Sequence, residues 1–300
     1  MKPLSLPAVL TAVVTTVVLF LETTTAFVVP SHRQQRQQQQ PSPSSLSIQA
    51  GAIFSAPAND SITSITGTFR VPTLSIPIQG PLSHRAPGIY AFSLSVGIGG
   101  YPGPGSSSLC PPTSSALRAG IDVFYNGFAD APMAPYAWYQ YGPASAQGAF
   151  AYAGFVVEDG DLVRVTVDVT GEKGVDVVME NFGKDDGKAE GRTAGQKVPP
   201  TFGLGDVEAL VGGLCRSEAA WVLEDHLDET GGTVPVAVGN FTEVVFGEMK
   251  VTTAAGGMII GGDGKGVKVV DLEIGEQGGK LTECTAGMGE VRCKRVPGGQ

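Results

Sequence analysis

This chain has few histidines and no excess of positive charge. Only three of its 300 residues are histidines, and only His84 and His226 lie beyond residue 47, in unrelated sequence contexts. This scarcity argues against a Ser-His-Asp triad and against a zinc site, so we expect no metal and no cofactor. Lys and Arg number 20 against 29 Asp and Glu, which gives a formal net charge of −9. Such an acidic chain disfavours nucleic acid as a partner.

Long apolar runs are also rare, and the one present lies at the start of the chain. A basic Met1-Lys2 start precedes an apolar run over residues 8–21, and small residues follow at Thr24-Thr25-Ala26. These are the parts of a secretory signal peptide, which we assign to residues 1–26. The run is short for a membrane span. Because no second run approaches that length, we expect no membrane association after the signal is removed.

Residues 27–47 lack the apolar side chains that a folded core requires. They consist largely of Gln, Ser and Pro and contain no acidic residue. This composition predicts a disordered, low-complexity leader. Together with the signal peptide it indicates a secreted or secretory-lumen protein. A second interpretation stays open, because Ala26-Phe27 followed by a basic, Ser-rich stretch resembles the bipartite plastid signals of algae with complex plastids.

The four cysteines are an even number, which behind a signal peptide predicts two disulfides. Cys284 and Cys293 bracket a Gly-containing turn at residues 286–289, which would let them close a hairpin. The sequons that begin at Asn59 and Asn240 are candidate glycosylation sites and fit the same route.

Turn-forming residues and short alternating segments, in contrast, are abundant. The chain has 42 Gly and 21 Pro, and only 16% of its residues are charged, which favours short strands joined by tight turns. Apolar and polar residues alternate over residues 68–71, 116–125, 162–170, 175–179, 244–251 and 269–274. A two-turn helix is indicated only at residues 207–214. We therefore expect an all-β sandwich or barrel that forms one domain over residues 48–296.

Alternation also decides which side chains share a face of a strand. In residues 116–125, Arg118 and Asp122 lie together on the face opposite the apolar side chains. In residues 221–225, Glu224 points away from the face that carries Trp221. Without further information, Glu224 would be interpreted as a solvated strand carboxylate and Arg118 as a surface cation, since few charged residues are catalytic.

Four motifs occur in order along the chain. They are TGTFRVP at residues 66–72, YAWYQY at 136–141, EDGD at 158–161, and the segment from Cys215 to Asp225, which ends in AAWVLED. Together they resemble the motifs of the glutamic peptidases, or eqolisins. The resemblance implies the fold of that family, a two-sheet antiparallel β-sandwich of the concanavalin A type found in lectins and glucanases. It also implies a Cys110–Cys215 disulfide, which would bring the strands of Arg118 and Glu224 close together.

The same resemblance implies roles for individual residues. Glu224 matches the family's catalytic Glu, a general base on water, and Arg118 stands where the family has a catalytic Gln that donates to the oxyanion. The substrate-binding positions of the cleft fall on Asp122, Trp138, Gln140 and Tyr141. The family activity is endopeptidase cleavage at acid pH, so the implied partner is a polypeptide substrate.

The departures from the family pattern cluster at these positions. Ser95 and Gly99 replace a Trp and an Asp, and Gln140 replaces a Glu. A guanidinium beside Glu224 would favour its ionised form and occupy its lone pairs, which leaves a weaker base. We therefore expect a secreted glutamic-type endopeptidase whose activity is impaired by Arg118. The alternative is a pseudoenzyme, a non-catalytic β-sandwich that binds peptide or glycan.

Overall fold

The computed structural model describes residues 49–77, 86–99, 110, 115–143, 149–152, 154–170, 174–184, 196–197, 213–225, 236–259, 266–274 and 279–296. The expected signal peptide and leader, and most of the expected helix at residues 207–214, lie outside these ranges. Within the described part, no helix is long and apolar enough to cross a membrane.

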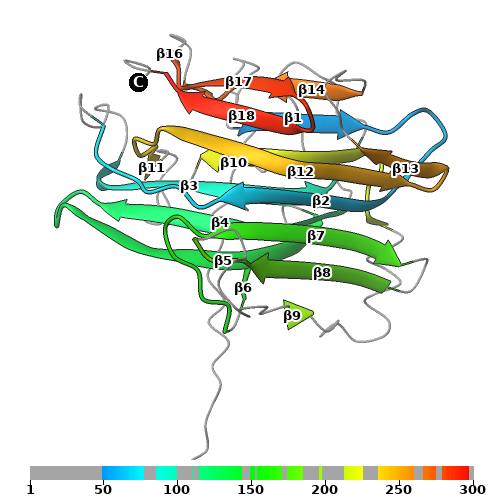
Figure 1. Ribbon diagram of the computed structural model, residues 1–300, viewed down its shortest axis with the longest axis horizontal. Coiled ribbons are helices and arrows are strands. Elements are labelled where there is room, and N and C mark those ends of the chain that lie inside the picture. Colours follow the sequence, from blue (N-terminus) through cyan, green and yellow to red (C-terminus); the bar gives the residue numbers. More distant parts are fainter. Residues whose placement is uncertain are drawn as a thin grey trace, which may run out of the picture.

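The described strands form two large sheets, sheet A and sheet B, whose strands run across the view in Figure 1. Sheet A has the order β14 (Val267–Val270), β1 (Gln49–Ser55), β10 (Glu218–Asp225), β3 (Ala86–Ile98), β4 (Ser115–Asn126), β5 (Ala131–Pro143) and β6 (Phe150–Ala151), with β11 (Val236–Ala237) beside β3. Sheet B has the order β17 (Thr282–Gly287), β18 (Glu290–Arg295), β12 (Glu243–Thr253), β2 (Ile62–Arg70), β7 (Leu162–Thr170), β8 (Gly174–Asn181) and β9 (Gln196–Lys197), with β13 (Gly256–Ile259) beside β12. A short pair, β15 (Glu273–Ile274) and β16 (Gly279–Lys280), stands apart from both sheets.

The predicted all-β sandwich is confirmed. Pairing is antiparallel throughout the described ladders except where β11 meets β3. The two sheets bury one continuous apolar core, to which sheet A contributes Leu94 and Ile121 and sheet B contributes Phe69 and Val165. Strand β7 has the predicted bounds, and its valines are buried while Arg164 stays partly exposed. Each sheet therefore has one core face and one outer face.

Trp221 links the two sheets and fixes the position of β10. Its side chain is fully buried, and its indole Nε1–H donates to the backbone oxygen of Thr66 on β2 at 2.9 Å. A Cβ added to Gly67 would lie 2.4 Å from the indole ring, so glycine is required for this close approach. Because Trp221 points into the core, Glu224 three residues later points to the outer face of sheet A.

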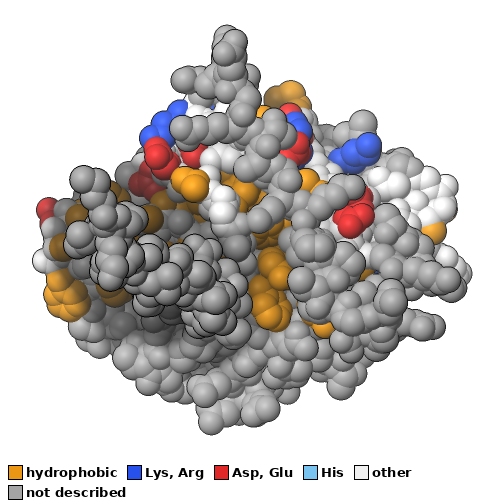
Figure 2. All heavy atoms as spheres, turned by 90° about the horizontal axis from the view of Figure 1, so that it is seen from below, with side chains coloured by type: hydrophobic (Ala, Val, Ile, Leu, Met, Phe, Trp, Pro, Cys, Tyr) orange, Lys and Arg blue, Asp and Glu red, His pale blue; other side chains and the backbone are white. Residues whose placement is uncertain are grey.

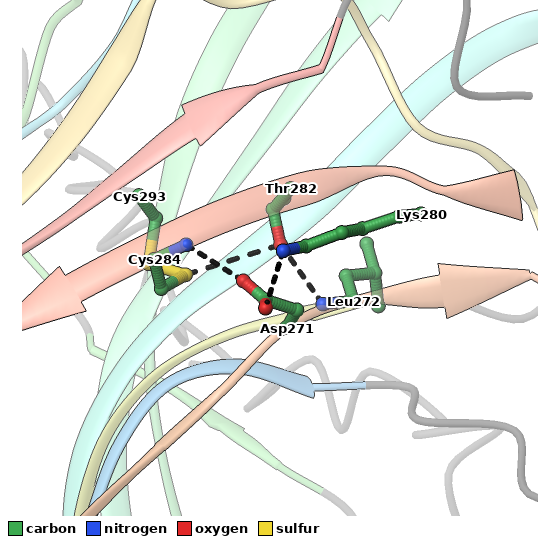
Figure 3. Close-up of a disulfide and its surroundings, with 6 residues drawn as sticks. All are labelled: Asp271, Leu272, Lys280, Thr282, Cys284 and Cys293. Carbon is green, nitrogen blue, oxygen red and sulfur yellow. Dashed lines mark hydrogen bonds and ion pairs between the residues drawn. A yellow bond between two sulfur atoms is a disulfide. The ribbon is translucent and has the colours of Figure 1, made fainter.

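The strand predicted over residues 269–274 is interrupted, because β14 ends at Val270 and β15 begins at Glu273. Between them, Asp271 Oδ1 accepts from the Cys284 backbone N–H at 2.6 Å, and the Leu272 N–H donates to Thr282 Oγ1 at 2.8 Å. Figure 3 shows these bonds beside the disulfide, with Lys280 Nζ 2.9 Å from Asp271 Oδ2. Side-chain partners thus replace the strand ladder at this bend.

The predicted Cys284–Cys293 disulfide is confirmed. The two cysteines are directly opposite each other in the β17–β18 hairpin. Met288 and Gly289 both have positive φ, at 49° and 81°, which is the conformation that a two-residue hairpin loop requires. The bridge therefore closes the last hairpin, as the spacing indicated.

Several surface cations of sheet B and of its loops lie next to carboxylates. Arg164 contacts Glu248 at 2.8 Å and Glu180 at 3.3 Å, and Lys184 contacts Glu158 at 3.1 Å. In Figure 2, which views the molecule from below, the coloured Lys and Arg side chains likewise lie beside Asp and Glu. These basic side chains are thus neutralised locally.

Candidate functional site

Four polar side chains form a row across the outer face of sheet A. In register, Gln49 of β1 is opposite Glu224 of β10, Glu224 is opposite Ser93 of β3, and Ser93 is opposite Asp122 of β4. Paired residues on neighbouring strands share a face, so these four side chains lie side by side. Glu224 and Asp122 are 102 residues apart in the sequence. In sheet A only β3 lies between their strands.

Arg118 and Glu224 form an ion pair within this face. Arg118 Nη1 lies 2.9 Å from Glu224 Oε1, and the residues are only 6% and 4% exposed. The expectation that the two side chains meet is confirmed. The interpretation of Glu224 as a solvated carboxylate is wrong, because both charges are buried and compensate each other there.

Two glutamine side chains hold the ion pair from either side. Gln140 of β5 accepts from Arg118 Nη2 at 2.7 Å, and Gln49 donates through Nε2 to Glu224 Oε1 at 2.8 Å. Both glutamines are buried. Since their amides are neutral, the charges of Arg118 and Glu224 balance each other within this group of four.

Small residues on β3 let Arg118 reach Glu224. Arg118 is opposite Gly97, whereas Glu224 is opposite Ser93, four residues earlier on β3, which is a displacement of about 13 Å at ~3.3 Å per residue. The arginine side chain must therefore cross β3 obliquely. A Cβ at Gly97 would lie 2.7 Å from Arg118 Cγ and 2.4 Å from the Leu117 carbonyl oxygen. Glycine at 97 and serine at 95 leave the space for this crossing.

Asp122 is the centre of a second hydrogen-bonded group. Its Oδ1 accepts from Ser93 Oγ–H and from the indole Nε1–H of Trp138 on β5. Trp138 is almost fully buried. Burial, and secondarily the charge of Asp122, raise the pKa of the neighbouring Tyr136. The structure thus brings Asp122 and Trp138 together on the outer face, as the sequence predicted.

Tyr141 lies on the other side of the sheet. It is opposite Leu117 of β4 and belongs to the apolar core between the sheets. This corrects the expectation that Tyr141 lines the cleft beside Gln140. Neighbouring residues of a strand point to opposite faces, so Trp138 and Gln140 can face the site only if Tyr139 and Tyr141 point away from it.

The Cys110–Cys215 disulfide is confirmed, with 5.5 Å between the Cα atoms. The Cys215 N–H donates to the Ser115 carbonyl at 3.1 Å, so the bridge ties the start of β4 to the segment before β10. Gly99 lies beside it with φ 76°, and an added Cβ would be 2.6 Å from the Cys215 carbonyl oxygen. Position 99, an Asp in the family pattern, therefore has no room for a side chain in this backbone.

An apolar patch borders Glu224 on the outer face. It consists of Ile53, Ala220, Val222 and Val270, all at most 4% exposed. Ile53 lies four residues after Gln49 on β1, and Val222 lies two residues before Glu224 on β10. Because both spacings are even, Ile53 and Val222 lie on the same face as Gln49 and Glu224. The row of polar side chains thus lies next to this apolar patch along β1 and β10.

The two sequons differ in their surroundings. Asn59 is exposed in the turn between β1 and β2, where the Asp60 N–H donates to the Pro57 carbonyl. Asn240 is half-buried and exchanges both backbone hydrogen bonds with Ser75, and its Nδ2 donates to Ser75 Oγ at 3.2 Å. Glycosylation at either residue stays a prediction.

Sequence reasoning missed Gln49 and Ser93. Ser93 carried a usable signal, because Ser93, Ser95 and Gly97 alternate with large apolar residues, which indicates a strand face closely covered by neighbouring side chains. Gln49 carried no local signal, and only its register with Glu224 reveals it. Among the described residues, no three His, Cys, Asp or Glu side chains gather in a way that could hold a metal ion.

Known proteins resemble this chain in sequence and in fold. The Peptidase A4 family matches residues 47–295. Aspergillopepsin-2 of Aspergillus niger is 30% identical over 244 residues, which cover 78% of this chain and 72% of that protein.

Two solved structures share the fold. Scytalido-glutamic peptidase with a transition state analog inhibitor has a TM-score of 0.56 at 20% identity, covering 84% of this chain and 99% of its own. SCP-B, a member of the eqolisin family in a complex with the tripeptide Ala-Ile-His, has a TM-score of 0.52 at 19% identity with the same coverage. At these identities the structures establish the sandwich fold, and the sequence match over most of the chain establishes the family. The chain therefore belongs to the peptidase A4 family, the glutamic peptidases.

Proposed function

We propose that this protein is a secreted glutamic-type peptidase in which Glu224 occupies the general-base position and Arg118 impairs cleavage by pairing with it. The observation that carries this proposal is the contact between Arg118 Nη1 and Glu224 Oε1 at 2.9 Å, with both side chains buried. Polypeptides are the substrate class of the family, so the implied reaction is hydrolysis of a peptide bond.

The ion pair opposes catalysis because a general base needs a lone pair directed at water. Oε1 of Glu224 already accepts hydrogen bonds from Arg118 and Gln49. Moving Arg118 away from Glu224 costs free energy, because removing one partner of a buried ion pair typically costs about 3–5 kcal/mol. A substrate would have to offset that cost before Glu224 could act on water.

A non-catalytic protein that binds peptide or glycan is the second candidate. It is favoured by the hydrogen bonds that join Arg118, Glu224, Gln140 and Gln49, because such a buried network can serve the fold without catalysis. In this reading Asp122, Trp138 and Gln140 bind a ligand and no bond is cleaved.

Secretion is part of the proposal. Two disulfides support an oxidising compartment, and the sequence assigns a signal peptide to residues 1–26 and a leader to residues 27–47. Delivery to a plastid through a bipartite signal is the alternative. Locating a fluorescent fusion of the full chain separates the two.

The test compares the wild type with Arg118→Gln and Glu224→Gln in cleavage of a denatured protein at acid pH. We expect weak cleavage by the wild type, at least tenfold faster cleavage by Arg118→Gln, and none by Glu224→Gln. Arg164→Gln is the matched control, because Arg164 pairs with carboxylates on the opposite sheet. It should leave the rate unchanged.

Two outcomes would overturn the proposal in different directions. Robust wild-type cleavage that Glu224→Gln abolishes and Arg118→Gln does not increase would make Arg118 a working donor. No cleavage by any variant would favour the non-catalytic protein.

A further inference from the structure

Gln49 makes a contact with Glu224 that its place in the sequence does not suggest. It is the first residue of β1, on the opposite side of β10 from Arg118. Its Nε2 donates to Glu224 Oε1 at 2.8 Å across 175 residues of sequence. The two residues are direct neighbours in the β1–β10 ladder, so the strand pairing itself holds the amide against the carboxylate.

Two donors converge on one oxygen of Glu224. Gln49 Nε2 lies 2.8 Å and Arg118 Nη1 lies 2.9 Å from Oε1. A glutamine amide carries two N–H groups and a guanidinium carries five. Both donors are buried, and electrostatic stabilisation is strongest where water is excluded. Negative charge near Oε1 is therefore stabilised from both sides.

We propose that Gln49 is a further catalytic residue, whose amide supplies from β1 the oxyanion donor that the family pattern places at position 118. This inference rests on the proposed function. Position 118 of this chain carries a guanidinium, and Gln49 is a glutamine in direct contact with Glu224. The Gln–Glu pair is thereby rebuilt from a different strand.

The reaction balances without any further reactant. Glu224 takes a proton from water while the water oxygen bonds to the carbonyl carbon, and the π electrons of the C=O bond move to its oxygen. The carboxyl is then neutral and the negative charge lies on the substrate, so Gln49 donates to the oxyanion. Next the C–N bond breaks and the proton on Glu224 passes to the leaving nitrogen. The products are a carboxyl group and an amine.

Replacing Arg118 by methionine isolates the role of Gln49. Methionine keeps the unbranched shape of the arginine stem and donates no hydrogen bond, so in Arg118→Met position 118 no longer donates while Gln49 still donates to Glu224 Oε1. We expect Arg118→Met to cleave unfolded protein within about tenfold of Arg118→Gln. Adding Gln49→Met should lower kcat by about 10²–10³, the usual loss of an oxyanion donor, with KM within about threefold.

The outcomes separate this inference from the proposed function. Cleavage by Arg118→Gln but not by Arg118→Met would overturn the role of Gln49 alone, because the donor would then have to stand at 118. The role of Gln49 would also be overturned if adding Gln49→Met to Arg118→Met changed kcat by less than about threefold. Absence of Glu224-dependent cleavage from every variant would overturn both.

Folding of each variant is checked by its circular dichroism spectrum before assay. If Arg118→Met does not fold, Gln49→Met in the wild-type chain replaces it, and the same loss of kcat is expected for the residual Glu224-dependent cleavage. An unchanged residual rate would refute the proposal. Gln49→Asn keeps the amide but shortens its reach, so its kcat should lie between the kcat of the chain with Gln49 and that of Gln49→Met.

Discussion

The Arg118–Glu224 ion pair should appear as a large coupling energy in a double-mutant cycle. The cycle consists of the wild type, Arg118→Met, Glu224→Gln and the double variant. Each single variant leaves the opposite charge buried without its ionic partner, at residues that are 6% and 4% exposed. The double variant leaves neither charge. The coupling therefore reports the cost of an unpaired buried charge in this site.

The magnitude follows from the partners that remain. Loss of one member of a buried ion pair typically costs about 3–5 kcal/mol. Gln49 still donates to Glu224 after Arg118→Met, and Gln140 still accepts from Arg118 after Glu224→Gln. We therefore expect about 3 kcal/mol for each single variant, near the lower end. If the double variant costs no more than either single one, the coupling is about 3 kcal/mol.

Urea unfolding at neutral pH measures all four free energies of unfolding. Single effects that add within about 0.5 kcal/mol would refute the buried pair, because independent sites behave in that way. A parallel cycle at Arg164 and Glu248 is the control. That pair is 31% and 59% exposed, so its coupling should stay below about 1 kcal/mol.

Two further predictions concern the disulfides and Asp122. The bridges Cys110–Cys215 and Cys284–Cys293 span 105 and 9 residues, so the chain-entropy relation assigns about 4.7 and about 2.6 kcal/mol to them. Replacing the first pair by serine should lower the urea midpoint more, and the reverse order would contradict that relation. Trp138→Phe removes the N–H that donates to Asp122 and should cost about 1.5–3 kcal/mol. A change below 0.5 kcal/mol in urea unfolding would show that water replaces the indole.

Alternation predicted the fold well because it is a local property of each strand. Residues 162–170 were predicted as a strand from four alternating valines, and β7 covers Leu162–Thr170. The prediction was wrong over residues 269–274, where Asp271 and Thr282 take backbone partners away from the ladder. These side-chain hydrogen bonds join residues 271–272 to residues 282–284. The alternation within one segment cannot predict such contacts with another segment.

The site was predicted only in part, for a similar reason. Strand periodicity placed Arg118 and Asp122 on one face, and family resemblance singled out Glu224. Neither could indicate Gln49, because its contact depends on the register between β1 and β10. Tyr141 was assigned to the cleft by its motif, although the period of two that places Gln140 there puts Tyr141 in the core.

The departures from the family pattern fit together as one rearrangement. Ser95 lies between Val222 and Gly120 in the ladder, under the oblique line from Arg118 to Glu224. The bulky Trp that the family pattern has at 95 would occupy that line, so the arginine can reach Glu224 only because the side chain at 95 is small. Gln140 completes the change, because a Glu there would compete with Glu224 for the guanidinium. Arg118→Gln alone leaves Ser95, Gly99 and Gln140 as departures from the family pattern, so its recovery of cleavage should be incomplete.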